Sequence, residues 1–225
     1  MEAQPVGEVF RYLMLNYDIP IGFEESDLDR EKSDLLFETN PVLRAPHKMK
    51  QGDVQYTTTS QLRFEAGTHP ITLYIEDGSV EDVFNEIIRQ LEDYNWEISD
   101  DVVNIFPVKG RNKKFEELLG MNVKRFTFEK GETVDDITKK IMALPEFGSF
   151  LSRNKLKFDG FRMGMNFVLK AQYGRVIDEG MDFSNLTFRD LLNKVTKVKR
   201  GGWALNWRRV WSNMRAEPTV LDIDI

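Results

Sequence analysis

The stretch from Gly78 to Phe106 reads GSVEDVFNEIIRQLEDYNWEISDDVVNIF, and its pattern changes from the period of a helix to the period of a strand. Ser79 and Asp82 nearly match a capping box, with aspartate in place of the usual glutamate. The apolar residues that follow at helical spacing are Val80, Val83 and Ile87. The residues beyond them alternate and turn at Ser-Asp-Asp. The stretch therefore predicts a capped helix followed by a β-hairpin with an acidic turn.

The same opening returns twice, as ETVDDITKKIMAL and as LTFRDLLNKVTKV. The hydroxyl residues are spaced by 133 − 79 = 54 and 187 − 133 = 54 positions, and each precedes an aspartate by three; they are Ser79, Thr133 and Thr187. Alternating residues before each helix indicate a strand. The middle copy is the weakest, because Thr138 stands where the others are apolar. We predict an α+β fold of repeated β-α-β-β units, small mixed sheets each packed by a helix.

The copies suggest two tandem lobes. We expect an N-terminal lobe, with an irregular insertion and one clear unit, and a C-terminal lobe, with one degenerate and one clear unit. The corresponding ranges are 1–110 with insertion 25–69 and unit 70–108, then 111–225 with units 122–145 and 180–225. KGRNKK is interpreted as a charged connector between them. One continuous α+β domain is the alternative.

Composition limits the classes of function. The chain has 225 residues, of which 41% are hydrophobic and 30% charged, and its net charge is −6. This charge disfavours general binding of nucleic acid or anionic lipid. The lack of cysteine excludes disulfides and thiolate catalysis. No apolar run approaches the roughly 20 residues of a membrane span. The N-terminal residues are not those of a signal peptide, so we expect either a cytoplasmic protein or a mature periplasmic segment.

The unit ITLYIEDGSVEDVFNEIIRQLEDYNWEISDDVVNIF, and less fully MDFSNLTFRDLLNKVTKVKRGGWALNW, resembles the short N-terminal domain of secretins and TonB-dependent receptors (STN). The resemblance implies a small non-enzymatic docking domain of the bacterial envelope. Such a domain sits before an outer-membrane pore or barrel and contacts a periplasmic or inner-membrane protein. No barrel or secretin core follows here, and the unit is repeated. Only the docking role, with a protein partner in the envelope or a secretion system, is carried over.

The candidates for chemistry are few. His47 and His69 are the only histidines, and neither has the spacing of metal ligands. Paired carboxylates can serve acid–base chemistry, but each pair here falls at a turn or a helix start; the pairs are Glu24–Glu25, Asp100–Asp101 and Asp135–Asp136. We therefore expect no catalytic residue, no cofactor and no metal.

A basic, tryptophan-bearing segment runs from Lys194 to Arg215. Our first interpretation is that its tryptophans fill the core and its basic side chains are solvated. The second is a docking face, with partner-binding residues Trp203, Trp207, Arg208, Arg209 and Trp211. The third is binding of single-stranded nucleic acid or another polyanion. An enzyme with a site near the 25–69 insertion is a further hypothesis. We favour a non-enzymatic docking module, which binds its partner through this segment or through a free strand edge.

Overall fold

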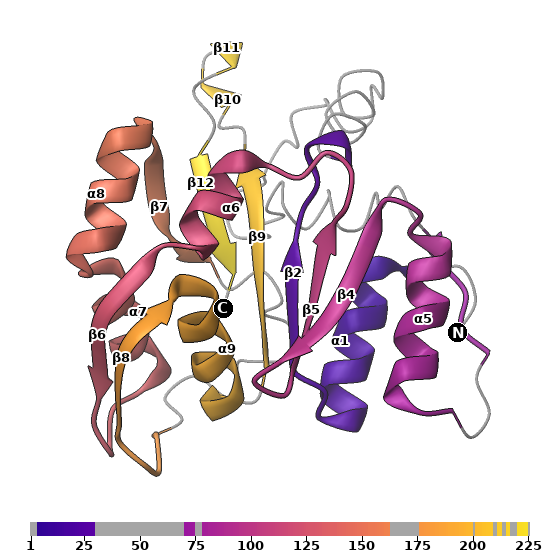
Figure 1. The fold of residues 1–225 in the computed structure, drawn as a ribbon, viewed down its shortest axis with the longest axis horizontal. Helices are drawn as coiled ribbons and strands as arrows, with labels where there is room; N and C mark the ends of the chain where they lie inside the picture. The colour runs from indigo at the N-terminus through magenta and orange to yellow at the C-terminus, as the bar shows by residue number, and fades with distance from the viewer. Residues whose placement is uncertain are drawn as a thin grey trace, which may run out of the picture.

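The structure is a computed structural model that describes residues 4–29, 70–74, 78–162, 176–199, 201–208, 211–212, 215–216 and 220–224. Most of the 25–69 insertion and both histidines lie outside the described residues. The fold is α+β, as the sequence predicts (Figure 1). In the part of the chain that the structure describes, no helix is long and apolar enough to cross a membrane.

The first half of the chain contains the following main elements among its described residues, besides a helical turn at 27–29. They are β1 (Gln4–Pro5), α1 (Val6–Tyr17), β2 (Ile21–Glu24), β3 (Pro70–Ile71), α5 (Val80–Gln90), β4 (Tyr94–Ser99) and β5 (Val102–Pro107). The strand expected before α5 is short, because β3 ends at Ile71.

The second half adds four helices and seven strands among its described residues. They are α6 (Lys113–Leu119), β6 (Asn122–Phe128), α7 (Val134–Met142), α8 (Pro145–Asn154), β7 (Lys157–Arg162), β8 (Met181–Thr187), α9 (Phe188–Lys199), β9 (Gly202–Arg208), β10 (Trp211–Ser212), β11 (Arg215–Ala216) and β12 (Val220–Asp224).

The three predicted capping boxes are present. In the first, the Asp82 N–H donates to Ser79 Oγ at 3.1 Å, and the Ser79 N–H donates to Asp82 Oδ2 at 2.8 Å. The same reciprocal pair of bonds opens α7 at Thr133 and α9 at Thr187. Each box satisfies N–H groups that a helix start leaves free, so these aspartates have a structural role.

One six-stranded sheet runs through both halves of the chain, in the order β4-β5-β2-β9-β12-β7 (Figure 1). The predicted hairpins β4–β5 and β9–β12 are antiparallel, whereas β2 is parallel to both β5 and β9. Asp100 and Asp101 both have positive φ, 53° and 59°, as a two-residue primed turn requires. Because β2 pairs with β9, the two predicted lobes share one sheet.

The sheet separates two hydrophobic clusters. Successive residues of a strand point to opposite faces, and β9 contributes Trp203 and Leu205 to one cluster and Ala204 to the other. The Ala204 cluster includes the buried residues of α1 and α5, and the Trp203 cluster includes those of α6 to α9. The two halves therefore place their helices on opposite faces of one sheet.

The junction between the halves depends on a close approach at Gly22 in β2. A β-carbon at this position would overlap the indole ring of Trp203 in the neighbouring strand. Glycine is the residue that allows a ring to lie directly on the backbone of the next strand. The tight contact fills the middle of the sheet with a large aromatic group, which is 1% exposed.

The interpretation of KGRNKK as a connector is corrected for its last part, because α6 begins at Lys113. The Asn112 side chain caps this helix by accepting from the N–H groups of Lys114 at 2.9 Å and Phe115 at 3.4 Å. Phe115, Leu118 and Leu119 are buried. These three residues pack α6 into the Trp203 cluster.

Candidate functional site

Strand β4 is an outer strand of the six-stranded sheet and pairs with β5 alone among the described strands. The Val103 N–H donates to a carbonyl just before β2, at 3.0 Å, so Val103 faces β2. Hydrogen-bonding direction alternates along a strand, so Asn104 faces β4, where its partner in register is Glu97. Trp96 and Ile98 therefore direct their N–H and C=O groups away from β5, toward the outer edge.

The side chains of these two residues lie on the face of the sheet that carries α5. The Trp96 indole donates to Asn85 of α5 at 3.1 Å, and its ring lies 5.6 Å from the Phe84 ring. Ile98 follows two residues later, about 6.6 Å along the strand, and is 58% exposed. Trp96 and Ile98 therefore form an apolar strip along the outer edge.

One group on this edge already has a partner within the chain. The Trp96 N–H donates to the side-chain oxygen of Asn95 at 2.8 Å. A carboxamide that curls over the edge of a strand is one way to protect it from unwanted pairing. The outer edge of β4 is therefore partly covered by its own Asn95.

Strand β9 holds the equivalent place in the second half, because it also follows a capped helix and begins a hairpin. Its residues Trp203 and Leu205 belong to the cluster that includes α9, as Trp96 packs against the cluster that includes α5. The Leu205 carbonyl accepts from the Glu25 N–H, just after β2, at 3.0 Å. The edge of β9 that corresponds to the outer edge of β4 is thus filled by β2.

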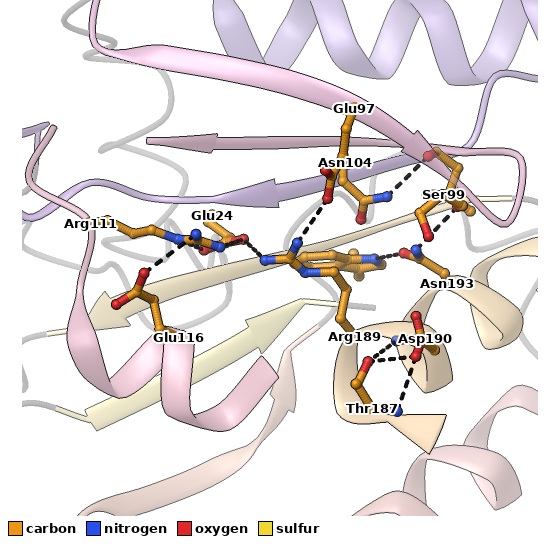
Figure 2. Close-up of polar contacts among 12 residues, drawn as sticks. Glu24, Glu97, Ser99, Asn104, Arg111, Glu116, Thr187, Arg189, Asp190 and Asn193 are labelled. Atoms are coloured by element: carbon orange, nitrogen blue, oxygen red, sulfur yellow. Dashed lines mark hydrogen bonds and ion pairs between the residues drawn. The ribbon is translucent and has the colours of Figure 1, made fainter. Parts of the chain in front are cut away.

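Beneath the sheet, on the α9 side, lies a polar cluster around Glu24 (Figure 2). Arg111 binds the Glu24 carboxylate with two bonds, Nε to Oε2 at 3.1 Å and Nη2 to Oε1 at 2.9 Å. Arg189 of α9 donates to Glu24 Oε1 at 2.6 Å and to Glu97 of β4 at 3.0 Å. Arg111 also lies 3.4 Å from Glu116 of α6. The cluster therefore ties α9 and α6 to β2 and β4.

The charges of this cluster do not cancel. Three carboxyl groups share two guanidinium groups, so the acidic groups of the cluster outnumber the basic ones by one. Glu24 is buried, and desolvation raises its pKa above the ordinary value, while Arg111 and Arg189 oppose the rise. Glu97 is 49% exposed on β4. Glu97 therefore presents a carboxylate to solvent beside the outer edge of β4, as Glu116, which is 50% exposed, does on α6.

A second group of polar contacts continues along α9 (Figure 2). Asn193 accepts from the Trp203 indole at 2.8 Å and donates to the Ser99 carbonyl at 3.3 Å. Asn104 Oδ1 and Thr196 Oγ1 are buried and have no hydrogen-bond partner. The two bonds of Asn193 therefore position α9 relative to the hairpin and to β9.

The acidic turn of the β4–β5 hairpin binds two lysines of the basic segment. Lys194 lies 3.3 Å from Asp100, and Lys197 lies 2.6 Å from Asp101. Bonding to Lys197 lowers the pKa of Asp101. Near this turn, a hollow of about 340 Å³ has Met14 among the residues of its wall. Two of the cations expected on a phosphate-binding or docking face are thus paired inside the chain.

Of the expected partner-binding residues, only Trp203 has a side chain among those that the structure describes. Trp203 is buried in the second cluster, so for this residue the core-packing interpretation holds and its side chain is not offered to a partner. The backbones of Trp207 and Arg208 lie in β9 and that of Trp211 in β10. Their side chains, and Arg209, lie outside what the structure describes.

The acidic pairs of the sequence also have structural positions. Asp100 and Asp101 form the hairpin turn, and Asp136 caps α7. Glu24 is the exception: its burial between two arginines was not foreseen, because Arg111 and Arg189 are distant in sequence. Within the described ranges, no group of three or more histidine, aspartate or glutamate residues is arranged to hold a metal ion. Most of the 25–69 insertion lies outside the described residues.

No family model, no curated protein and no solved structure matches this chain.

Proposed function

We propose that this chain is a non-enzymatic docking module of the bacterial envelope, built from STN-like units, which binds an extended segment of a partner protein by strand addition to the outer edge of β4. One observation carries the proposal. β9 pairs with β2 along one of its edges. β4 occupies the equivalent place in the first half, and its corresponding edge has no neighbour among the described strands.

The internal pairing of β2 with β9 supports a particular geometry for the added segment. β2 is only four residues long and is parallel to β9. Its pairing shows that a short strand suffices at this kind of edge. By the same geometry, the partner segment adds parallel to β4 and pairs with the outward N–H and C=O groups of Trp96 and Ile98.

The edge is held in place before any partner arrives. A tight turn closes the β4–β5 hairpin, and the contacts of Trp96 with Phe84 and Asn85 fix β4 against α5. On the other face, Arg189 links Glu97 to Glu24. An edge that is already rigid loses little conformational entropy on binding. These contacts support β4 as a docking surface.

The test is a selection of random displayed peptides on the immobilised chain, followed by titration of each selected peptide against two variants. Ile98→Pro removes an outward N–H but no bond to β5, because Ile98 faces away from that strand. Ile98→Val keeps the backbone and is the matched control. We expect selected peptides to lose about tenfold in affinity for Ile98→Pro and to bind Ile98→Val as they bind the wild type.

Equal affinity for both variants would contradict strand addition at β4. If circular dichroism shows that Ile98→Pro disturbs the fold, strand addition is tested on the wild-type chain instead, by measuring its affinity for peptides whose backbone nitrogens are methylated. The envelope part of the proposal has its own test. The wild-type chain should retain from a bacterial envelope fraction a protein that Ile98→Pro does not retain, and failure to retain one counts against this location.

A further inference from the structure

We infer that the segment bound at β4 is basic: an extended strand in which lysine or arginine alternates with apolar residues, with the basic side chains on the Glu97 face and the apolar ones beside Trp96 and Ile98. This inference rests on the proposed function and adds the chemistry of the partner to it. The charges around β4, the two faces of the strand and the geometry of β2 on β9 carry it.

The part of the chain that surrounds this edge is strongly acidic. Between positions 78 and 101 there are eight acidic residues and one basic residue, Arg89; the acidic residues are Glu81, Asp82, Glu86, Glu92, Asp93, Glu97, Asp100 and Asp101. Among the described residues, five cations pair with members of this group: Arg89, Lys109, Arg189, Lys194 and Lys197. With 8 − 5 = 3, the α5–β4 region keeps three negative charges in excess. A cationic segment is attracted to such a region and an anionic one is repelled.

The excess charge is present on the strand itself. Glu97 is half exposed, and its partner Arg189 also binds the buried Glu24, so one guanidinium serves two carboxylates. A basic side chain of an added strand would lie next to Glu97, because neighbouring residues of adjacent strands share a face. The added strand thus supplies the cation that the cluster lacks.

The opposite face of β4 calls for apolar residues. Trp96 is partly buried against Phe84, and Ile98 is an exposed apolar side chain on the same edge. An apolar side chain placed between them would remove this strip from water. A segment with basic and apolar residues at alternate positions satisfies both faces at once, because side chains of a strand alternate.

The pairing of β2 with β9 also predicts which N–H groups of the added strand matter. The Glu25 N–H faces β9, so those of Phe23 and Ile21 face it too. The side chains of Phe23 and Ile21 lie in the cluster away from α9. If the added strand pairs with β4 as β2 pairs with β9, its residues that donate backbone N–H groups to β4 have side chains on the face away from α5. These are the basic residues of the inferred segment.

The experiment uses capped synthetic peptides and the whole chain, with binding followed by calorimetry or fluorescence anisotropy. The probe is a hexapeptide of alternating lysine and valine. One control replaces each lysine by glutamate, and another replaces each lysine by serine. Two further copies carry methyl groups on backbone nitrogens, those of the lysines in one and those of the valines in the other. Each peptide is titrated against the wild type, Ile98→Pro and Glu97→Gln.

We expect the lysine peptide to bind the wild type about tenfold more tightly than the glutamate peptide does, and the difference to shrink at high salt. Methylation of the lysine backbone nitrogens abolishes binding, whereas methylation of the valine backbone nitrogens preserves it. Glu97→Gln weakens the lysine peptide about threefold. The matched control, Glu129→Gln, changes an exposed acid that follows β6 on the other side of the molecule (Figure 1) and leaves binding unchanged.

The outcomes separate the inference from the proposed function. If serine and glutamate peptides bind as tightly as the lysine peptide, and Ile98→Pro weakens all three, strand addition stands and the basic partner is wrong. If the lysine peptide binds Ile98→Pro as it binds the wild type, strand addition itself is wrong. If the chain elutes as a dimer that Ile98→Pro converts to a monomer, a second copy occupies β4, and the inferred partner is overturned.

Discussion

α5 and α9 begin with the same cap and lead into the same kind of hairpin, yet they are buried differently. α5 presents Phe84 and Ile87 to one face of the sheet and leaves its other side in water. α9 buries Leu191 and Leu192 in its own cluster, and it also buries Asn193 against the hairpin of the other half. The same local unit is therefore a surface element in one place and an internal element in the other.

The difference follows from which edge of each hairpin is filled. β9 lies between β12 and β2, so α9 is covered by strands of both halves. β4 has a strand on one side only among those described, and α5 lies beside it at the rim of the sheet (Figure 1). Between the two halves, α9 buries Asn193, which bonds to Ser99 and Trp203, whereas α5 needs only an apolar stripe. The open rim is where we propose that the partner binds.

The largest effect is expected from the two tryptophans that mark this difference. Trp203→Ala empties a site that is fully buried between the halves and should lower the free energy of unfolding by about 3–5 kcal/mol. Trp96→Ala, at the open rim, removes a partly exposed ring and should cost about 1 kcal/mol. Urea unfolding followed by circular dichroism measures both. Equal losses would show that the rim of the sheet is as tightly packed as its middle.

The second effect concerns the buried carboxylate. Arg189→Gln removes one of the two guanidinium groups that bind Glu24 and leaves the buried carboxylate with Arg111 alone, so we expect a loss of about 3 kcal/mol in the free energy of unfolding. Glu86→Gln, which breaks the exposed pair with Arg89 on α5, should cost less than about 0.5 kcal/mol. A similar loss for both variants would contradict the contrast between the two helices.

The two regions should also respond to pH in opposite senses. Burial raises the pKa of Glu24 above 4.5, so the stability it contributes is fully present below that pH and is lost as pH rises through the raised pKa. The hydroxyl and then the backbone N–H of Ser79 lower the pKa of Asp82 below 3.8, so its contribution is present above that pH and is lost as pH falls through the lowered pKa. Unfolding curves across the acid range test this: Glu24→Gln should remove a downward slope with rising pH, and Asp82→Asn an upward one. Slopes of the same sign would contradict the assignment.

A smaller effect is expected from the caps. Thr187→Ala and Ser79→Ala each remove one cap hydroxyl, which costs about 1 kcal/mol. The first turn of α9 holds Phe188 and Leu191, both fully buried, so it cannot fray alone, and the loss should appear in global unfolding. The first turn of α5 is exposed and can open locally. Amide hydrogen exchange should therefore show faster exchange confined to that turn in Ser79→Ala. Faster exchange confined to the first turn of α9 in Thr187→Ala would be evidence against this view.

The parts of the fold that the sequence predicts are those that local chemistry decides. Ser79 with Asp82 is enough to begin a helix, and Asp100 with Asp101 is enough to turn a hairpin, whatever surrounds them. Asn112 carries the same kind of signal for α6, within KGRNKK, a segment whose charge is typical of a connector. Such features depend on residues only a few positions apart.

The pairing of β2 with β9 depends on residues far apart in the chain, which is why no pattern predicts it. Gly22 has no side chain to signal that Trp203, about 180 residues later, lies on its backbone. Asn193 and Arg189 look like solvent-exposed positions of an amphipathic helix, because the hairpin that covers them belongs to the other half. The candidate edge was predicted only as a general class, since a free edge is defined by the strand that does not pair with it.

The smallest effect comes from Asn95, and it tests whether the rim of the sheet restrains its own binding. Asn95→Ala removes the side chain that accepts from the Trp96 N–H, so an incoming strand no longer competes with it for that hydrogen bond. A typical net hydrogen bond is worth about 1 kcal/mol; since part of it is replaced by water, we expect the affinity for the alternating lysine–valine peptide to rise about threefold. The matched variant on the filled edge, Leu205→Val, keeps the backbone carbonyl that accepts from Glu25 and should leave peptide affinity unchanged. Weaker binding by Asn95→Ala would mean that the carboxamide contacts the added strand directly, and Asn95 would then belong to the docking surface as a ligand of the partner instead of a guard of the edge.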